Sequence, residues 1–303
     1  FAIGLASLAW HNAANNATGD CDGTSEWSCQ VPLVEGNNLI TVTMVDVIGF
    51  IRQANVTLVL DTTSPSISID SPVDGAGQAS DVIMVTWTGS DDGSGMAYYL
   101  VSLDGGAPIN TTGSSHNFTG VADGGHQVTV TAFDVAGNQA ADAVALNVDT
   151  TPPSLQIVQP DMGEALDHDD VTVEWNCSDG VSGVAHVNLT LDGGAPVQLL
   201  ANATSYTFTG LADGEHQVNV TAVDHLGNTA WAEVSFIVDT IAPSLVMVSP
   251  DEGSYSTTSI VGVDWEANGT GSGIALMEVS LDGDNWTAVL GSSYTTPQLD
   301  EGP

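Results

Sequence analysis

The sequence predicts an all-β protein, an elongated array of tandem β-sandwich domains, and three observations lead to this fold class. The chain repeats with a period of about 90 residues, its apolar residues alternate with polar ones, and turn motifs rich in Asp and Gly recur throughout. Alternation with a period of two is typical of strands that bury one face, whereas amphipathic helices show a period of about 3.6. We therefore expect short antiparallel strands in every repeat and no helix.

Three similar motifs open the repeats. They read DTTSP at residues 61–65, DTTPP at 149–153 and DTIAP at 239–243, so the openers lie 88 and 90 residues apart. Residues 1–60 lack an opener but end like a repeat, and the pattern of the last repeat is interrupted at its end. The predicted domains are the C-terminal part of a domain at 1–60, complete domains at 61–148 and 149–238, and the N-terminal part of a domain at 239–303.

Alternation identifies the core strands of the complete repeats. Ile83, Val85 and Trp87 point to one face of their strand, and the same pattern returns at residues 171–175. Two further core strands are expected at 128–132 and 144–148. Several short strands joined by Asp-Gly or Gly-Gly turns within about 90 residues describe an antiparallel β-sandwich of the immunoglobulin (Ig) type.

The second complete repeat reads DTTPPSLQIVQP, then a Trp-containing strand, then SDGVSGV, VNLTLDGGAP and LADGEHQVNVTAVDHLGN. This order of motifs resembles the tandem Ig-like repeats of large bacterial and archaeal surface proteins, and the resemblance covers nearly the whole chain. It implies an extracellular array but no single activity, because such repeats serve adhesins, S-layers, stalks and enzyme appendages alike. Two places depart from the pattern: Ile241 replaces the Thr of the other openers, and residues 46–50 lack the Asn of the Asp-x-x-Gly-Asn turn.

The charge of the chain excludes one class of partner. There are 38 acidic residues and a single basic one, Arg52, for a formal net charge of −37. Nucleic acid is excluded because phosphate binding needs clustered Lys and Arg. The longest apolar run, residues 1–10, has half the roughly 20 residues that a helix needs to cross a bilayer, so no membrane span is expected. A surface that is polar through Thr, Ser, Asn and Gly favours a secreted protein located at the cell surface.

Acceptors for N-linked glycans are unusually frequent. Ten of the 17 Asn residues stand in Asn-x-Ser/Thr motifs, whereas the Ser and Thr content would supply about three by chance. Alternation places Asn55, Asn176, Asn188 and Asn219 on outward faces, where a bulky sugar is tolerated. The alternative is that these motifs reflect only a Thr-rich strand surface. The predicted acceptors are Asn16, Asn55, Asn110, Asn117, Asn176, Asn188, Asn202, Asn219, Asn268 and Asn285.

The three cysteines fit an oxidising compartment. Cys21 and Cys29 are eight residues apart, flank a Gly-containing turn and could close a short loop by a disulfide; two free thiols are the alternative. Cys177 stands two residues after the inward Trp175, so we expect a small buried thiol that fills a position in the core.

The sequence does not predict an enzyme. Of the seven His residues only His126 and His216 recur at equivalent positions, where a hydrogen-bonded structural role is expected. His168 lies among acidic residues at 167–170 in a loop without a counterpart in the other repeats, which favours a solvated acidic loop over a transition-metal site. Repeated positions supply no Ser/His/Asp or Cys/His set.

Aspartates at the predicted domain junctions suggest Ca²⁺ as a cofactor besides the glycans. We expect each opener Asp to lie near the Asp of an inter-strand turn, with Asp91, Asp92 and Asp179 close by. Carboxylate, amide and carbonyl oxygens suit Ca²⁺, and one Arg cannot neutralise such groups. The alternative is that these residues only cap turns, assisted by Thr62 and Thr150. The candidate ligands are the openers Asp61, Asp149 and Asp239 and the turn residues Asp46, Asp134 and Asp224.

These observations predict a glycosylated structural protein that forms a cell-surface layer or an extracellular filament, and the density of acceptors favours an archaeal source. An adhesin stalk that presents a distal binding domain is the first alternative, and a non-catalytic appendage of a secreted enzyme is the second. The interrupted repeats are interpreted as an excerpt of a longer array. If the ends are processing sites instead, residues 36–60 of one subunit have the right pattern to complete residues 239–303 of another by strand complementation.

Overall fold

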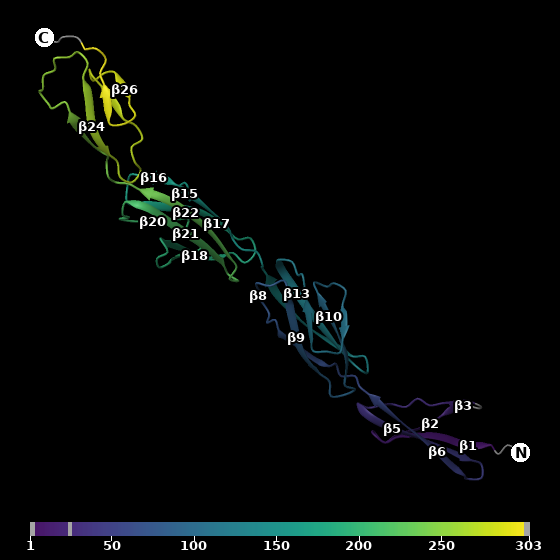
Figure 1. Ribbon diagram of the computed structural model, residues 1–303. Coiled ribbons are helices and arrows are strands. Elements are labelled where there is room, and N and C mark those ends of the chain that lie inside the picture. The colour runs from purple at the N-terminus through teal and green to yellow at the C-terminus, as the bar shows by residue number, and fades with distance from the viewer. Residues whose placement is uncertain (1–3, 24–25, 300–303) are drawn as a thin grey trace. The chain divides into compact units, whose positions relative to one another are not determined.

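The computed structural model describes residues 4–23 and 26–299, and its regular elements over these ranges are all strands (Figure 1). The predicted all-β fold is confirmed. Among these residues no helix has the length and hydrophobicity needed to cross a membrane. The chain separates into two compact units, Phe1–Thr150 and Thr151–Pro303. The four predicted domains stay a prediction, and the outer limits of the first and last lie outside the described residues.

The first unit begins with a single antiparallel sheet, in the order β2-β1-β5-β6. Trp10, Ile40 and the neighbouring Cys21 are the buried apolar side chains here, and Asn12 and Asn38 are buried polar ones. Val56, expected to face inward, lies opposite the buried Ile40 but is 48% exposed, and its strand β6 forms the edge of the sheet. The strands are β1 (Leu5–Asn12), β2 (Ala17–Asp20), β5 (Gly36–Asp46) and β6 (Ile51–Leu60), beside a small ribbon of β3 (Asp22–Gly23) and β4 (Trp27–Ser28).

A complete sandwich fills the rest of the first unit. Its sheets have the orders β12-β9-β7 and β11-β10-β13-β14-β8, and β8 runs parallel to β14 whereas the other pairs are antiparallel. The strands are β7 (Ser66–Ser71), β8 (Ala76–Gln78), β9 (Ile83–Ser90), β10 (Met96–Leu103), β11 (Ile109–Thr111), β12 (Ser115–Phe118), β13 (Gly124–Asp134) and β14 (Gln139–Val148).

The second unit starts with a sandwich of the same topology. Its sheets have the orders β15-β17-β20 and β16-β22-β21-β18-β19, and the parallel pair is β16 with β22. The strands are β15 (Ser154–Gln159), β16 (Glu164–Leu166), β17 (Val171–Ser178), β18 (Val184–Leu191), β19 (Val197–Leu200), β20 (Ser205–Phe208), β21 (Gly214–Asp224) and β22 (Thr229–Val238). Two sheets packed face to face with these connections form an Ig-like sandwich.

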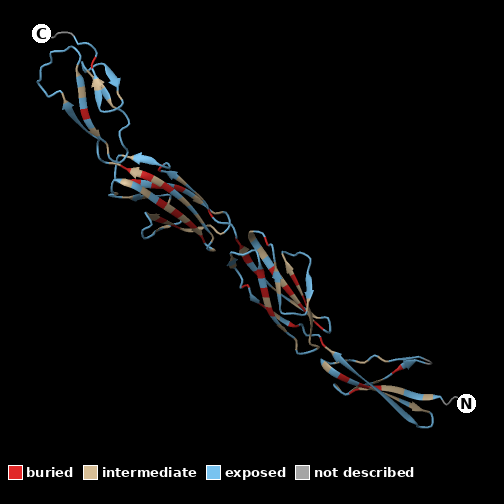
Figure 2. Ribbon diagram, in the orientation of Figure 1, coloured by how far each residue is buried: buried red, intermediate tan, exposed pale blue. Residues whose placement is uncertain are grey.

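The predicted core strands are confirmed in both complete sandwiches. Ile83 and Val85 are fully buried and Trp87 is 2% exposed, and the Trp87 ring meets Tyr99 edge-on at 5.6 Å between ring centres. Val173 and Trp175 occupy the same places in the second sandwich. Buried residues alternate with exposed ones along the long strands, as Figure 2 shows. Side chains from both sheets therefore share one core in each sandwich.

The second unit ends with an open arrangement. The sheet β23-β24-β27 repeats the order of the three-stranded sheets, and β25 pairs only with β26 among the described strands. Trp265 is 4% exposed, whereas Leu245 and Met247 are 65% and 56% exposed. The strands are β23 (Ser244–Ser249), β24 (Gly262–Asn268), β25 (Glu278–Ser280), β26 (Trp286–Ala288) and β27 (Ser293–Thr295).

Candidate functional site

Three carboxylates from distant parts of the sequence converge in the first complete sandwich. Asp61 precedes β7, Asp91 follows β9, and Asp134 is the last residue of β13. One carboxylate oxygen of each lies within 4.8 Å of the others. Asp61 is 7% and Asp134 is 2% exposed, so water reaches these two poorly. Like charges this close repel unless hydrogen-bond donors, a proton or a cation offset them.

Backbone N–H groups hold the three carboxylates in place. The Ser94 N–H donates to Asp61 Oδ2 at 2.6 Å and the Gly95 N–H to Asp91 Oδ2 at 2.7 Å. These bonds follow from the short turn after β9, whose amides point toward the carboxylates. The hydrogen bonds from Ser94 lower the pKa of Asp61, so its carboxyl is ionised at neutral pH.

Asn138 connects the opener to the turn. Its backbone N–H donates to Asp134 Oδ1 at 2.8 Å, and its side-chain Nδ2 donates to Asp134 Oδ2 at 2.7 Å and to the Asp61 carbonyl at 3.0 Å. The Asn that closes the Asp-x-x-Gly-Asn turn thus also fixes the start of the repeat. This second contact was not predicted, although the Asn is part of the repeated motif.

The structure brings some of the predicted metal ligands together and leaves others apart. Asp61, Asp91 and Asp134 lie in one group, and all three belong to the same sandwich rather than to two adjoining domains. Asp46 is not in this group; its Oδ1 accepts the N–H groups of Ile48 and Phe50 and closes its own turn. The chain has no Lys and only one Arg to neutralise the three carboxylates. Oxygen ligands of this kind fit a hard cation such as Ca²⁺.

The second repeat carries aspartates at the same positions. Asp224 is 2% exposed, and its Oδ1 accepts the Asn228 N–H at 2.9 Å. Burial raises the pKa of Asp224, but hydrogen bonds, from Asn228 above all, outweigh it and leave that pKa lowered. The Gly183 N–H donates to Asp179 Oδ1 at 2.7 Å. Asp149, the opener, is fully buried.

The third opener has different surroundings. The Ser272 N–H and Oγ donate to Asp239 Oδ2 at 2.7 and 2.6 Å, and these bonds lower the pKa of Asp239. Gly269 stands where the other repeats have Asp91 and Asp179. Asp239 is therefore held as a hydrogen-bonded turn residue, and this repeat lacks the carboxylate that follows β9 in the first sandwich.

The threonine after each opener binds an acid rather than the opener. The N–H and Oγ1 of Thr62 donate to the two carboxylate oxygens of Glu35, each at 3.0 Å, and those of Thr150 both donate to Asp123. Thr240 binds Asp213 in the same way. Under the turn-capping alternative, Thr62 and Thr150 assist these turns, and the hydrogen bonds that they donate go to Glu35 and Asp123. The acceptor is in each case the acid directly before an earlier core strand, β5, β13 or β21, and its repeated position was the available signal.

None of the ten predicted glycan acceptors is buried. Eight are exposed, and Asn188 and Asn219 are half-buried. Both of these lie on central strands of their sheet, and their neighbours Val187, Leu189 and Val218 are fully buried. Their side chains therefore lie on the face away from the core, where a linked sugar meets no core residue.

Cys21 and Cys29 are joined by a disulfide, with their Cα atoms 4.6 Å apart. It ties the end of β2 to the segment after β4, beside Trp10 and Ile40. Cys177 is a free thiol, half-buried rather than fully buried, and packs at the edge of the second core. Burial raises the pKa of this thiol, which makes it a poor nucleophile.

Histidines occupy two kinds of surroundings. His168 pairs with Asp167 at 3.0 Å, and both side chains are largely exposed. His126 and His216, in contrast, have poorly exposed rings, each bonded to an Asp of the preceding inter-strand turn. The sequence motif identified both His residues but not their partners, Asp104 and Asp192.

Comparison with known proteins identifies the domain type. Residues 153–220 match the family model described as Bacterial Ig domain. The match lies within the second complete sandwich, and the first complete sandwich has the same sheet topology, so both are Ig-like domains arranged in tandem. Such domains carry no catalytic fold of their own.

Three relatives share the repeated region. The chain is 31% identical over 196 residues to Exoglucanase B of Cellulomonas fimi, with 60% of this chain and 18% of that protein covered. It is 27% identical over 191 residues to Chitinase A1 of Niallia circulans, and the match covers 60% of this chain and 27% of that protein. It is 27% identical over 299 residues to Halomucin of Haloquadratum walsbyi, and the match covers 78% of this chain and 3% of that protein. The chain thus spans less than a third of each relative's length.

Proposed function

We propose that the chain is a glycosylated structural array that works outside the cell, in a cell-surface layer or a filament. The observation that carries this proposal is the placement of the ten acceptors, none of which is buried although the strands around them alternate between core and surface. A disulfide at Cys21 and Cys29 fits an oxidising compartment. Halomucin, which matches most of this chain, bears a name that points to a mucin-like protein.

Two measurements on native material test this proposal. Intact-mass spectrometry should give a mass above the 31.0 kDa of the bare polypeptide for this segment. Antibody labelling of native cell envelopes should place the segment in a continuous layer or along a filament. A bare mass together with scattered labelling would contradict the proposal.

A second candidate is a non-catalytic spacer in a secreted enzyme. Exoglucanase B and Chitinase A1 favour it, since both are named as enzymes that act on polysaccharides and both share the repeats. An adhesin stalk is the remaining alternative, because the same repeats would hold a binding domain at a distance. The full-length gene product separates these candidates, since a catalytic or ligand-binding domain beside the array would identify the spacer or the stalk.

We also propose that Asp61, Asp91 and Asp134 bind Ca²⁺. The supporting observation is the convergence of three carboxylate oxygens within 4.8 Å in a chain with one basic residue. Bound Ca²⁺ would fix the opener against the two turns of its sandwich and so stiffen the start of the domain.

Self-association through the two open arrangements is a further part of the proposed function. The face of β6 that carries Val56 and Leu58 is uncovered, and a cavity of about 430 Å³ lies beside Trp265 in the last sheet. In the complete sandwiches a five-stranded sheet covers the three-stranded one. The open sheets of two copies are therefore suitable for completing one another.

A further inference from the structure

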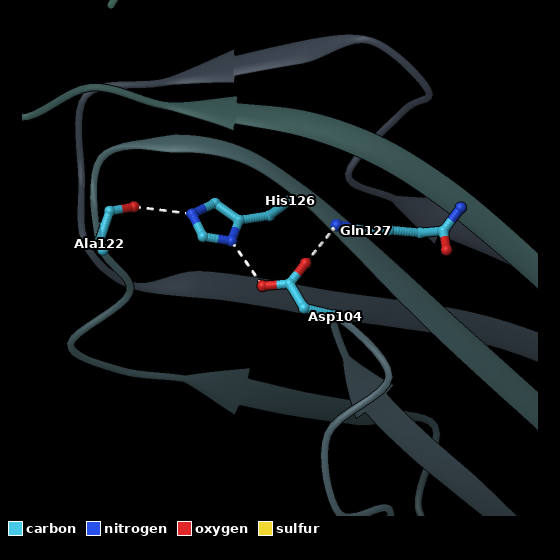
Figure 3. Close-up of polar contacts among 4 residues, drawn as sticks. All are labelled: Asp104, Ala122, His126 and Gln127. Carbon is cyan, nitrogen blue, oxygen red and sulfur yellow. Dashed lines mark hydrogen bonds and ion pairs between the residues drawn. The ribbon is translucent and has the colours of Figure 1, made fainter.

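His126 is placed between two oxygen atoms that can only accept hydrogen bonds. Its Nδ1 lies 2.8 Å from Asp104 Oδ2, and its Nε2 lies 2.7 Å from the Ala122 carbonyl oxygen (Figure 3). The other oxygen of Asp104 accepts the Gln127 N–H at 2.8 Å, so this carboxylate bridges the two residues of β13. The His126 side chain is 12% exposed, which leaves little room for water to replace either partner.

This geometry requires a particular protonation state. A neutral imidazole has one N–H donor and one bare nitrogen, whereas the imidazolium has two donors. Since a carbonyl and an ionised carboxylate offer no proton, both contacts are hydrogen bonds only when His126 carries two ring protons. In the neutral form one of the two contacts places lone pairs against each other and is lost.

The same arrangement recurs in the second sandwich. His216 Nδ1 lies 2.8 Å from Asp192 Oδ2, and Nε2 lies 2.8 Å from the Ala212 carbonyl oxygen. Gln217 donates its N–H to Asp192 Oδ1 at 2.8 Å. The two complete sandwiches thus form the same set of contacts around an equivalent His residue, so the arrangement is a repeated feature of this domain.

The bonds hold a turn that is unfavourable for its residue. Asp104 has a φ of 52° and Asp192 a φ of 49°, in the left-handed region that side-chain-bearing residues adopt at a cost. Each turn joins two strands of the larger sheet, β10 to β11 and β18 to β19. The His ring therefore fastens the tip of this hairpin to the loop that enters the central strand.

We propose that His126 with Asp104, and His216 with Asp192, are proton-dependent clamps that fasten this turn when the imidazole is protonated and weaken it when the proton leaves. We call these two pairs the His–Asp clamps. The ligand of the device is the proton itself, and the device goes beyond the structural role proposed above because it makes the stiffness of each complete sandwich depend on pH.

The charged groups around each ring support this assignment. His126 contacts Asp104 of the turn and the carbonyl group of Ala122 in the loop. Asp123, the residue after Ala122, accepts hydrogen bonds from Thr150. The strand on the other side of His126, β14, places apolar Leu146 opposite it. His216 faces Asp192 from the turn, Asp213 lies beside Ala212, and Phe236 lies opposite with ring centres 5.8 Å apart. Acidic neighbours favour the charged ring, and the chain supplies no nearby base.

The direction of the pH effect follows from the pKa values. Hydrogen bonding to Asp104 raises the pKa of His126 above its ordinary value of 6.5, and the bond from His126 lowers that of Asp104. Burial opposes protonation of His216, but its bonds to Ala212 and Asp192 outweigh it and raise its pKa as well. A group whose pKa is raised by folding stabilises the fold fully below about pH 6.5 and loses this contribution as pH rises through the higher, folded pKa. The pKa of Asp104 lies below its ordinary value of 3.8, so this carboxylate is still ionised at mildly acidic pH. The clamp is therefore closed in that range of pH.

Nitrogen-15 NMR of the full chain, labelled at histidine, tests the protonation state. His126 and His216, assigned by the variants H126Q and H216Q, should lose their second ring proton at a pH above the ordinary midpoint of about 6.5. In Asp104→Asn the turn keeps an oxygen acceptor but loses the charge, so the titration midpoint of His126 should fall while that of His216 stays. Titration of His126 at or below the ordinary midpoint in the unsubstituted chain would overturn the proposal.

Hydrogen exchange followed by mass spectrometry tests the mechanical consequence. At pH 6, amides around the turn at 104–106 should exchange roughly tenfold faster in H126Q than in the unsubstituted chain. The ratio should approach one as pH rises to 9, and the turn at 192–194 serves as the control within the same molecule. His168→Gln, at an exposed ring that also pairs with an Asp, should leave both turns unchanged. A ratio that does not vary with pH would mean that His126 has a packing role only.

Discussion

Replacing Asp91 by Asn is the sharpest test of calcium binding in the first complete sandwich. The substitution removes one of three negative charges, keeps the side-chain size, and leaves an amide oxygen that can still accept the N–H of Gly95. Asp92→Asn is the matched control, since it removes the same charge from the same turn at an exposed residue outside the group of three. Any difference between the two variants therefore reports on the position of the charge and not on its number.

The expected size of the effect follows from mass action. Calcium sites of extracellular modules have Kd values of about 10⁻⁴ to 10⁻³ M, so about 10 mM Ca²⁺ should stabilise the folded state by about 1.4 to 2.7 kcal/mol. A tenfold loss of affinity in Asp91→Asn would remove about 1 kcal/mol of this binding contribution, which corresponds to a fall in Tm of roughly 4 to 8 °C for a domain of this size. Asp92→Asn should stay within about 2 °C of the unsubstituted chain.

The assay compares each protein with Ca²⁺, with Mg²⁺ and after chelation. Because several domains unfold in one chain, a calorimetric Tm is combined with hydrogen exchange of peptides that cover residues 61–138. Ca²⁺ should slow exchange at Ser94 and Asn138, whose N–H groups bind the carboxylates. Equal Tm and exchange with and without Ca²⁺, or an equal loss in both variants, would show that the aspartates only cap turns.

Three further predictions address the other proposals. Asn188→Gln and Asn219→Gln should each lower the mass of native protein by one glycan, and an unchanged mass in both would argue against modification of these strands. Cys29→Ser should destabilise the first sheet by about 2 to 3 kcal/mol, seen as faster exchange in β1 and β2 but not in β17, and uniform or absent change would contradict a local role of the disulfide. Leu58→Asp, on the uncovered face of β6, should abolish concentration-dependent association in analytical ultracentrifugation, whereas Val59→Asp on the opposite face should not; equal behaviour of the two would exclude this face as the interface.

The core positions of the complete sandwiches could be predicted because they depend on local alternation. Val128, Val130 and Ala132 are fully buried, as their spacing predicts, since every second residue of a strand must face the same side. Short elements gave no such signal: β8 has three residues with a Gly in the middle, and its parallel pairing with β14 depends on where the chain crosses between sheets. Val56 followed the same rule onto the correct face, but alternation alone does not say whether a second sheet covers that face.

The candidate sites were predicted only in part, because they join residues whose distance in sequence carries no pattern. Asp91 was expected near the junction aspartates, but its contact with Asp134 arises from the packing of two sheets and not from any spacing in sequence. His126 and Asp104 are 22 residues apart and meet because β10 and β13 pair in one register. Their joint recurrence as His216 and Asp192 was the only available signal, and it shows that motifs repeated together are candidates for mutual contact.

The near absence of basic residues gives these features a common cause. In most proteins a buried Asp is offset by Lys or Arg, but this chain must offset its carboxylates with N–H donors, cations from solution or protonated His. Asp46 uses backbone N–H groups, His126 supplies the positive charge beside Asp104, and the three carboxylates around Asp61 retain charge that neither source fully balances. Hydrogen bonds to backbone N–H groups do not depend on the medium. On the proposals made above, the charge of His126 depends on pH and the group around Asp61 on divalent cations, so the array would take part of its stiffness from the surrounding fluid. The substitutions H126Q and Asp91→Asn are designed to remove these two dependences separately.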